Sequence, residues 1–308
     1  MPELPEVETI ARGLAKRVVG DVICSVWLGS KPEPFQSPAL EMAAILESQR
    51  IAGVARVGKH IVFDLEPYPQ AARHRGRKTK EIKEKRTAKK VKKSNHGRDR
   101  PDGAQESTAL RGAQWIVHLG MTGRVTVEAP GKEVEKHTHA ILSLGSGREL
   151  RFVDPRRFGR LRVAHGFQAA GKEPLEVELE AFVALFRGRK TPIKSALLNQ
   201  KLLSGVGNIY ADESLFRSSI RPRRRASSLT GKELGQLWRA VREVLQEAIA
   251  LGGSSISDYV NADGEEGFFQ FQHRVYGRRG EPCLVCQSPV RRIVIAGRSS
   301  HYCPRCQK

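Results

Sequence analysis

The first residues of the chain combine two groups that could do covalent chemistry. The sequence opens Met1-Pro2-Glu3, and an initiator methionine is usually removed before a small residue such as proline. Removal would leave Pro2 with a free secondary amine, whose pKa of about 8 lies below the value of about 10.4 for a lysine. Such an amine is a nucleophile that forms an iminium with a sugar aldehyde, and Glu3 could exchange the protons. The alternative is a solvated, frayed terminus.

Four of the five cysteines lie near the C-terminus in two pairs with metal-ligand spacing. The pairs are Cys283-x2-Cys286 and Cys303-x2-Cys306, with sixteen residues between them. Two such pairs supply four thiolates to one tetrahedral zinc ion. Because thiolates fill every position, we expect one structural Zn2+ and no place for a catalytic water. Two disulfides are the alternative, which a cytosolic setting disfavours.

The cysteine pairs frame a predicted hairpin with its tip near Ala296-Gly297-Arg298. A rigid hairpin that carries Arg291, Arg292 and Arg298 suits a DNA groove. The fifth cysteine, Cys24, lies in an apolar strand pattern, so we expect it to be a buried small hydrophobic side chain.

Two glycine-containing turns could insert side chains between bases. Leu119–Arg124 places Met121 at its tip, and Asp154–Arg160 carries Arg156 and Phe158. Apolar tips of this kind unstack a base step, and the fork of Arg156 could pair with the base left alone on the opposite strand. Either turn by itself is more often explained by packing. Together with the N-terminal amine and the cysteine pairs, the two turns favour the wedge interpretation.

A third turn, Leu203–Asn208, would join two helices. Its glycines could let the backbone approach a phosphate, and Asn208 would lie at a helix N-terminus, where anions bind favourably. An ordinary helix–helix turn is the alternative.

The secondary structure that we expect to position these residues changes along the chain, from one helix to strands and then to helices. A helical stripe of apolar residues covers Val7–Val19, with Pro5 before it and Gly20 after it. Short strands separated by turns follow up to about His165, which predicts an antiparallel sandwich. We expect these strands at 22–28, 51–57, 60–65, 114–118, 124–127, 140–144, 149–152 and 160–163. Four helices follow, at 175–186, 192–198, 208–217 and 231–251, the last with a capping box from Thr230 to Glu233.

The sequence therefore predicts an α+β fold in three parts. We expect an N-terminal β-sandwich domain over residues 1–165, a helical domain over 174–255, and a segment with the four-cysteine zinc finger over 256–308. An insertion at 68–111 interrupts the strand pattern and lacks periodicity, so we expect it to be disordered. Its run Arg73–Arg100 holds 14 Lys/Arg against three acids, a net charge of +11. A non-specific DNA tether and a functionless charged loop both stay open.

The formal net charge of the whole chain, +20, implies a polyanionic partner. No apolar run is long enough to span a membrane, and no strongly basic amphipathic helix stands out, so we expect no membrane role. The acidic N-terminus is not a signal peptide, which favours a cytosolic protein.

The motifs, in their order, resemble those of the formamidopyrimidine-DNA glycosylase family, the MutM-type repair enzymes. The matching stretches are MPELPEVET (1–9), HLGMTGR (118–124), DPRRFG (154–159), KTPIKSALLNQ (190–200), GVGNIYADE (205–213), GGSS (252–255), VYGR (275–278) and the paired CxxC motifs. The resemblance implies a β-sandwich, a helix–two-turn–helix domain and a zinc finger, with DNA in the cleft between the domains. It also implies a bacterial, cytoplasmic, nucleoid-associated monomer that acts on double-stranded DNA with oxidised bases or abasic sites.

The same resemblance implies a role for particular residues. Pro2 is similar to the Schiff-base nucleophile, Glu3 to the proton donor and Lys59 to a basic residue near the reacting sugar phosphate. The other implied roles are void filling (Met121, Arg156, Phe158), DNA contact (Asn208, Arg298, Lys190), and the lesion pocket (Glu6, Ser254, Ser255), with 254–269 as the loop that closes over a flipped base. Three features depart from the family: His60 replaces a tyrosine, Asn199 replaces an aspartate, and the basic insertion is atypical.

The implied activity is a bifunctional DNA glycosylase/AP lyase that removes oxidised purines, 8-oxoguanine and formamidopyrimidines, and cuts the strand by β,δ-elimination. One alternative is the endonuclease VIII type, which prefers oxidised pyrimidines, although its opening and its wedges differ. The other is a non-catalytic architectural DNA-binding protein, which the joint presence of Pro2, Glu3 and Lys59 disfavours.

Overall fold

The structure, a computed structural model, describes residues 1–68, 112–254 and 267–308. The basic run Arg73–Arg100 and the pocket candidate Ser255 lie outside these ranges, and so does the loop predicted at 254–269 except for its two ends. Among the described residues, no helix is long and apolar enough to cross a membrane.

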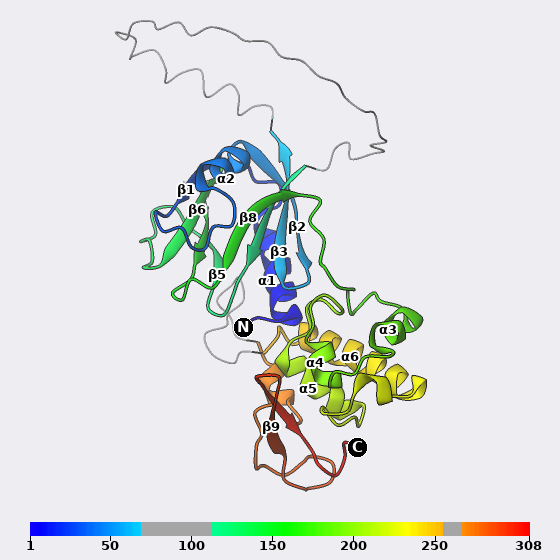
Figure 1. Cartoon of the computed structure of the whole chain (residues 1–308). Helices are drawn as coiled ribbons and strands as arrows, with labels where there is room; N and C mark the ends of the chain where they lie inside the picture. The colour runs from blue at the N-terminus through cyan, green and yellow to red at the C-terminus, as the bar shows by residue number, and fades with distance from the viewer. Residues whose placement is uncertain (69–111, 255–266) are drawn as a thin grey trace, which may run out of the picture.

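An antiparallel β-sandwich forms the N-terminal part, as the sequence predicts (Figure 1). One sheet has the strand order β1-β6-β7-β5 and the other β2-β3-β4-β8. Helix α1 (Leu4–Val18) packs its apolar face into the core that the two sheets share. The remaining elements are α2 (Ala39–Leu46), β1 (Ile23–Leu28), β2 (Gln49–Val57), β3 (His60–Pro67), β4 (Ala113–His118), β5 (Arg124–Glu128), β6 (Thr138–Leu144), β7 (Glu149–Val153) and β8 (Arg160–His165).

Helix α1 begins earlier than the apolar stripe alone predicts. Its first residue is Leu4 rather than Val7, because Pro5 is compatible with the first turn and the Glu6 carboxylate accepts the backbone N–H of Glu3 at 2.7 Å. The side chains of Val7, Ile10 and Leu14 are buried against the sheets. This early start draws the N-terminus into the junction between the sandwich and the helices (Figure 1).

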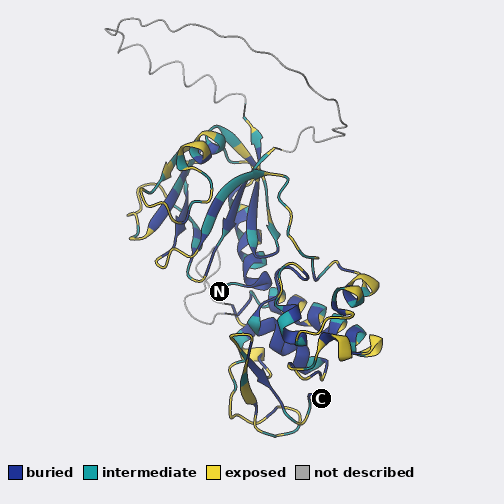
Figure 2. Cartoon of the chain, viewed as in Figure 1, coloured by how far each residue is buried: buried dark blue, intermediate teal, exposed yellow. Residues whose placement is uncertain are grey.

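The second part is helical and has its own apolar core (Figure 2). It contains α3 (Leu179–Phe186), α4 (Ile193–Leu197), α5 (Asn208–Arg217) and α6 (Gly231–Ala250). The predicted capping box of α6 is confirmed, since Glu233 N–H donates to Thr230 Oγ1 and Thr230 N–H donates to Glu233 Oε2. Helix α3 starts at Leu179 rather than Leu175, because the preceding residues form a turn whose Val177 carbonyl accepts the indole N–H of Trp238.

The C-terminal part is a hairpin of β9 (Arg291–Ile295) and β10 (Arg298–Tyr302) next to the cysteine pairs. Ala296 and Gly297 form its two-residue tip, both with positive φ, where the sequence predicts it.

The insertion leaves the sandwich at the end remote from the helices. Strands β3 and β4 pair antiparallel, with His60 opposite His118 at one end and Asp64 opposite Gln114 towards the other. The turn before His60 faces the helical part, because Gly58 lies against Ser204, and β3 runs from there towards the other end of the sandwich (Figure 1).

The prediction for Cys24 is wrong, because its side chain is exposed. Cys24 lies on β1, an edge strand, between Ile23 and Ser25, where the pairing with β6 shifts register. A register shift of this kind turns a side chain away from the face that simple alternation predicts.

Candidate functional site

A cleft of ≈ 620 Å³ opens where the sandwich, the helical part and the hairpin meet. Among its lining residues are Pro2, Glu3, Glu6, Lys59, Met121 and Asn208, which the sequence singled out. Ser254 and Arg298 line it too. Lys190, Arg156 and Phe158 are exposed and do not line this cleft.

Glu3 lies at the centre of the cleft floor, against the N-terminus of α5. Its carboxylate accepts the backbone N–H of Ile209 at 3.1 Å and that of Tyr210 at 3.5 Å. Gly207 makes this contact possible, since a Cβ there would lie 2.2 Å from the Glu3 carboxyl carbon. A Cβ at Gly205 would likewise meet Leu4. The sequence left a phosphate contact and an ordinary helix–helix turn open at these glycines, and in the structure Leu4 and Glu3 fill the space beside them.

Burial dominates the ionisation of Glu3. Desolvation raises the pKa of its carboxyl to about 7, against the opposing effects of Lys59 and of the two backbone N–H groups. About half of the Glu3 side chains are therefore protonated near neutral pH, so the group can both donate and accept a proton.

Glu6 is held by three hydrogen bonds from three parts of the chain. It accepts the N–H of Glu3, the hydroxyl of Tyr210, and the N–H of Ser254 at 2.8 Å. Burial raises the pKa of its carboxyl as well. Glu6 thus ties α1 to α5 and to the residue that precedes the segment 255–266.

Lys59 occupies the two-residue turn between β2 and β3, beside Gly58. Gly58 has φ +61, and a Cβ there would lie 2.1 Å from the Ser204 hydroxyl, so only glycine lets this turn approach the helical part. Burial lowers the pKa of the Lys59 ammonium, while the nearby carboxyls of Glu3 and Glu6 act to raise it. The Lys59 ammonium and the carboxyl groups of Glu3 and Glu6 therefore influence one another's ionisation.

The two predicted wedge turns lie against each other. A Cβ at Gly120 would lie 2.5 Å from the backbone of Phe158, so the turn that carries Met121 rests on the turn that carries Phe158. Asp154 joins them, because its carboxylate accepts the hydroxyl of Thr122 at 2.6 Å and the N–H of Gly159 at 2.8 Å. Met121 and Phe158 remain 46% and 48% exposed, which leaves two apolar tips facing outward.

Arg156 lies beside the second tip, with its guanidinium carbon 4.8 Å from the centre of the Phe158 ring. The turn structure accordingly groups Met121, Arg156 and Phe158 at one rim, although only Met121 reaches the cleft itself.

The hairpin is fastened to the helices by a buried ion pair to which the sequence analysis gave no role. Lys194 on α4 donates to Asp212 on α5 at 2.6 Å and to the carbonyl of Ser299 at 2.6 Å. Asp212 also accepts the hydroxyl of Ser300 and the N–H of His301. Both charged side chains are fully buried, and this arrangement positions Arg298 at the cleft. The sequence does contain a signal for this ion pair, since Lys194 stands beside apolar residues in KTPIKSALLNQ, and Asp212 does so in GVGNIYADE.

Three further acidic residues that the sequence did not single out fix the geometry. Glu213 accepts three consecutive backbone N–H groups, those of Arg274, Val275 and Tyr276. Across the domain junction, Glu8 and Glu173 both bind Arg56, on the strand that leads to Lys59.

Two residues that depart from the family pattern, His60 and Asn199, are held by local contacts. The His60 ring lies 5.1 Å from that of His118 and 5.0 Å from that of Phe167, and burial lowers the pKa of His60. It therefore acts as a neutral aromatic plane. The Asn199 side-chain oxygen accepts the N–H of Lys201 at 3.0 Å, which an aspartate oxygen could do equally.

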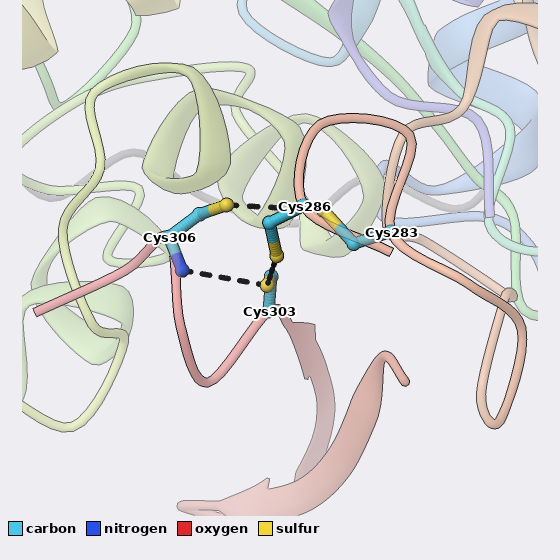
Figure 3. Close-up of side chains that lie close together, drawn as sticks. All are labelled: Cys283, Cys286, Cys303 and Cys306. Carbon is cyan, nitrogen blue, oxygen red and sulfur yellow. Dashed lines mark hydrogen bonds between the residues drawn. The ribbon is translucent and has the colours of Figure 1, made fainter. Parts of the chain in front are cut away.

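The four C-terminal cysteines come together as a metal site would require (Figure 3). Their sulfur atoms all lie within 4.8 Å of one another, with 3.9 Å between Cys283 and Cys306 and 3.4 Å between Cys286 and Cys303. A tetrahedral ion with Zn–S bonds of about 2.3 Å has sulfur atoms about 3.8 Å apart. The four thiolates therefore fit one zinc ion, and the prediction of a structural zinc is confirmed.

Comparison with known proteins gives one consistent result over the whole chain. Three family models match: "Formamidopyrimidine-DNA glycosylase N-terminal domain" over residues 1–161, "Formamidopyrimidine-DNA glycosylase H2TH domain" over 170–260, and "Zinc finger found in FPG and IleRS" over 280–308. The formamidopyrimidine-DNA glycosylase of Solibacter usitatus is 40% identical over 312 residues, with 100% of both chains covered. That of Thermus thermophilus is 41% identical over 320 residues, covering 100% of this chain and 98% of the relative.

Solved structures agree with these relatives. The crystal structure of MutM (Fpg) from Thermus thermophilus superposes with a TM-score of 0.76 at 39% identity, covering 99% of this chain and 98% of that one. Lactococcus lactis Fpg in complex with DNA that contains an abasic site gives a TM-score of 0.78 at 29% identity, with 99% of each chain covered. A structure of MutM with DNA that contains carbocyclic 8-oxo-G gives 0.79 at 29% identity, with 100% of each chain covered.

Proposed function

The chain belongs to the formamidopyrimidine-DNA glycosylase family, and from this premise we propose how its own residues excise a damaged base and cut the strand. It is a DNA glycosylase of base excision repair that holds one structural zinc. The proposal concerns the residue roles, the lyase step and the substrate range. Its main support is the convergence of Pro2, Glu3 and Lys59 in one cleft.

Pro2 is the nucleophile after removal of Met1. The lone pair of its nitrogen forms a bond to C1′ of the damaged nucleotide, and the glycosidic bond breaks with its electron pair on the base, which takes up a proton. Opening of the sugar ring leaves an iminium between Pro2 and C1′. Loss of a proton from C2′ then expels the 3′ phosphate, a second elimination expels the 5′ phosphate, and water releases the sugar fragment from Pro2.

Glu3 supplies and removes the protons of these steps. Its carboxyl is adjacent to Pro2, and its pKa of about 7 gives it useful acid and base forms at neutral pH. The N–H groups of Ile209 and Tyr210 keep it pointing at the cleft in both forms. Lys59 places a positive charge beside it, where the phosphates that flank the sugar would lie.

The other candidate residues, in the cleft and outside it, bind and distort DNA. Asn208 and Arg298 contact the backbone of the damaged strand, Lys190 contacts it further out, and Glu6 with Ser254 forms the base pocket. Met121 and Phe158 fill the void that a flipped nucleotide leaves, which offsets the few kcal/mol that flipping costs. We also propose that the protein acts as a monomer, with domain limits near residues 165, 174 and 255.

Borohydride trapping tests the chemistry. Incubation with duplex DNA that carries 8-oxoguanine should leave a covalent complex, and mass spectrometry should locate the added mass on Pro2. Pro2→Gly keeps a primary amine but loses the proline geometry, so excision should drop sharply while DNA binding persists. Full activity of a variant with an uncleaved N-terminal extension would refute the nucleophile assignment.

A panel of defined lesions tests the substrate class. Formamidopyrimidines and 8-oxoguanine should be excised faster than oxidised pyrimidines. The opposite order would assign the chain an endonuclease VIII type of specificity, and binding without cleavage would assign it an architectural role.

A further inference from the structure

Two short stretches of chain, 251–253 and 267–269, flank the segment 255–266 and hydrogen-bond to each other. The N–H of Phe268 donates to the carbonyl of Leu251 at 2.9 Å, and that of Phe269 donates to Gly253 at 2.9 Å. A Cβ at Gly267 would lie 2.4 Å from the Gly253 carbonyl oxygen, so the two stretches are in contact at this point. Ser254, the last residue before the segment, is thereby held at a defined place in the cleft lining.

His273 supports Ser254 from behind. Its Nε2 lies 3.2 Å from the Ser254 hydroxyl oxygen. The ring is 9% exposed and packs edge-on against Phe269 and Tyr276, at 5.6 and 5.5 Å between ring centres. His273 does not line the cleft, whereas Ser254 does. The histidine is therefore placed to act on a bound base only through the serine.

Burial lowers the pKa of His273 to about 4, so the ring is neutral at physiological pH. A neutral imidazole has one N–H and one bare nitrogen, and Nε2 is the ring atom that faces the Ser254 hydroxyl. Tyr276 is the titratable residue whose ring packs against it.

Two contacts fix the orientation of Ser254. Its hydroxyl pairs with His273, and its backbone N–H donates to Glu6 at 2.8 Å. The hydrogen bond to His273 restricts the rotation of the hydroxyl, so the group is presented to the cleft in one orientation.

We propose that His273 is a positioning residue for base excision, which holds the Ser254 hydroxyl in one orientation towards the flipped base. This inference rests on the proposed glycosylase function. It implies that loss of the His273 contact weakens recognition of the base and leaves the later steps at the sugar unchanged.

The test separates base recognition from the later chemistry within one enzyme. Excision of 8-oxoguanine is compared with strand cleavage at a preformed abasic site, which has no base for Ser254 to contact. His273→Phe keeps a ring between Phe269 and Tyr276 but removes the hydrogen-bond partner of the Ser254 hydroxyl. The ratio of the excision rate to the cleavage rate should fall about tenfold, the effect of losing one oriented hydrogen bond.

A double-mutant cycle and a rescue complete the test. In a Ser254→Ala background, His273→Phe should cause no further loss, because its partner is absent. His273→Gln places a side-chain amide near the position of Nε2, which can hydrogen-bond to the Ser254 hydroxyl in either direction, and should restore most of the ratio. Additive losses, no change in the ratio, or failure of His273→Gln to rescue while His273→Phe is impaired would each overturn the proposal. Trapping and abasic-site cleavage by the unsubstituted protein report separately on the proposed function.

Discussion

Glu3 experiences two opposing electrostatic effects at the level of a single residue. Burial disfavours its charged form, whereas Lys59 and the backbone N–H groups of α5 favour it. Burial is the larger effect, and the pKa rises from 4.5 to about 7. The same imbalance that makes Glu3 a useful acid should also cost stability at neutral pH, since the native state resists ionisation of this group.

The pH dependence of stability checks this balance. Because the folded pKa of about 7 exceeds the unfolded value of 4.5, the stabilising contribution is fully present below pH 4.5 and is lost as the pH rises through about 7. Relative to Glu3→Gln, the free energy of unfolding of the wild type should fall by something on the order of 3 kcal/mol across that window. Urea unfolding from pH 4.5 to 8 measures it, with the exposed Glu180→Gln as the control. Parallel curves for wild type and Glu3→Gln would contradict the raised pKa.

Arg156 should control the choice of the opposite base. Its planar fork lies beside Phe158 at the rim, where the base left unpaired would be, and cytosine offers acceptors that suit the fork. Arg156→Ala should flatten the preference for damage opposite cytosine over adenine by ~1–3 kcal/mol of discrimination. Single-turnover excision of 8-oxoguanine in the two pairings gives the ratio, with the neighbouring Arg157→Ala as the control. The role is refuted if Arg156→Ala and Arg157→Ala leave the same ratio.

At the scale of elements, the position of the β9–β10 hairpin depends on a buried charge pair as well as on zinc. Burial lowers the pKa of Lys194, and the nearby Asp212 opposes that shift. Asp212 in turn binds two residues of β10, so α4, α5 and the hairpin share one polar cluster around a fully buried ion pair. Removing one partner of such a pair is costly, because the other charge stays buried without compensation.

Lys194→Met should therefore destabilise the fold by about 3–5 kcal/mol and weaken DNA binding through the displaced Arg298. The control is Glu247→Gln, which disrupts the half-exposed pair of Glu247 with Arg217 and should cost only about 0–1 kcal/mol. Denaturant unfolding and DNA titration measure both effects. Similar losses for the two variants would mean that burial does not set the cost.

Removal of zinc should also displace the β9–β10 hairpin, at the end next to the cysteine pairs. Cys303→Ser leaves three thiolates, so the protein should lose its metal, the hairpin should become disordered, and productive DNA binding should be lost, since metal binding and folding of such fingers are coupled. Metal analysis together with DNA titration checks the coupling. Wild-type affinity in a metal-free preparation would argue against it.

Across the whole molecule, the cleft lies at the junction of three parts with separate cores. Arg56 of the sandwich, whose side chain is 7% exposed, binds Glu8 on α1 and forms a two-pronged bond to Glu173, in the chain that leads to the helical part. The insertion is connected at the opposite end of the sandwich, where β3 and β4 are neighbours. Its removal should accordingly leave the cleft undisturbed.

Deleting residues 71–102 should leave single-turnover excision on short duplexes nearly unchanged at saturating enzyme. It should weaken binding to long undamaged DNA and flatten the slope of log affinity against log salt, because the run Arg73–Arg100 carries a net charge of +11. The slope counts the counterions that phosphate contacts release, so it distinguishes a tether from a solvated loop. An unaltered slope would assign the insertion no part in binding.

The sequence alone determined the features that depend on neighbours along the chain. Period and turn residues located the strands of the sandwich and the helices from Leu179 to Ala250 to within a few residues, because local backbone preferences extend over one or two turns. The spacing of the cysteines predicted the zinc site, and the order of the motifs predicted the family. Helix α2 was missed because it is short, with only Met42 and Leu46 buried.

The tertiary structure decided which of those residues act on one another. Glu3 meets Ile209 from 206 positions away, Lys194 meets Asp212 across two helices, and His273 reaches Ser254 across the segment between them. None of these contacts has a periodicity or a spacing, since each arises where separate elements pack together. Burial at those contacts shifts the pKa values of Glu3, Lys194 and His273, and burial is a property of the folded chain as a whole.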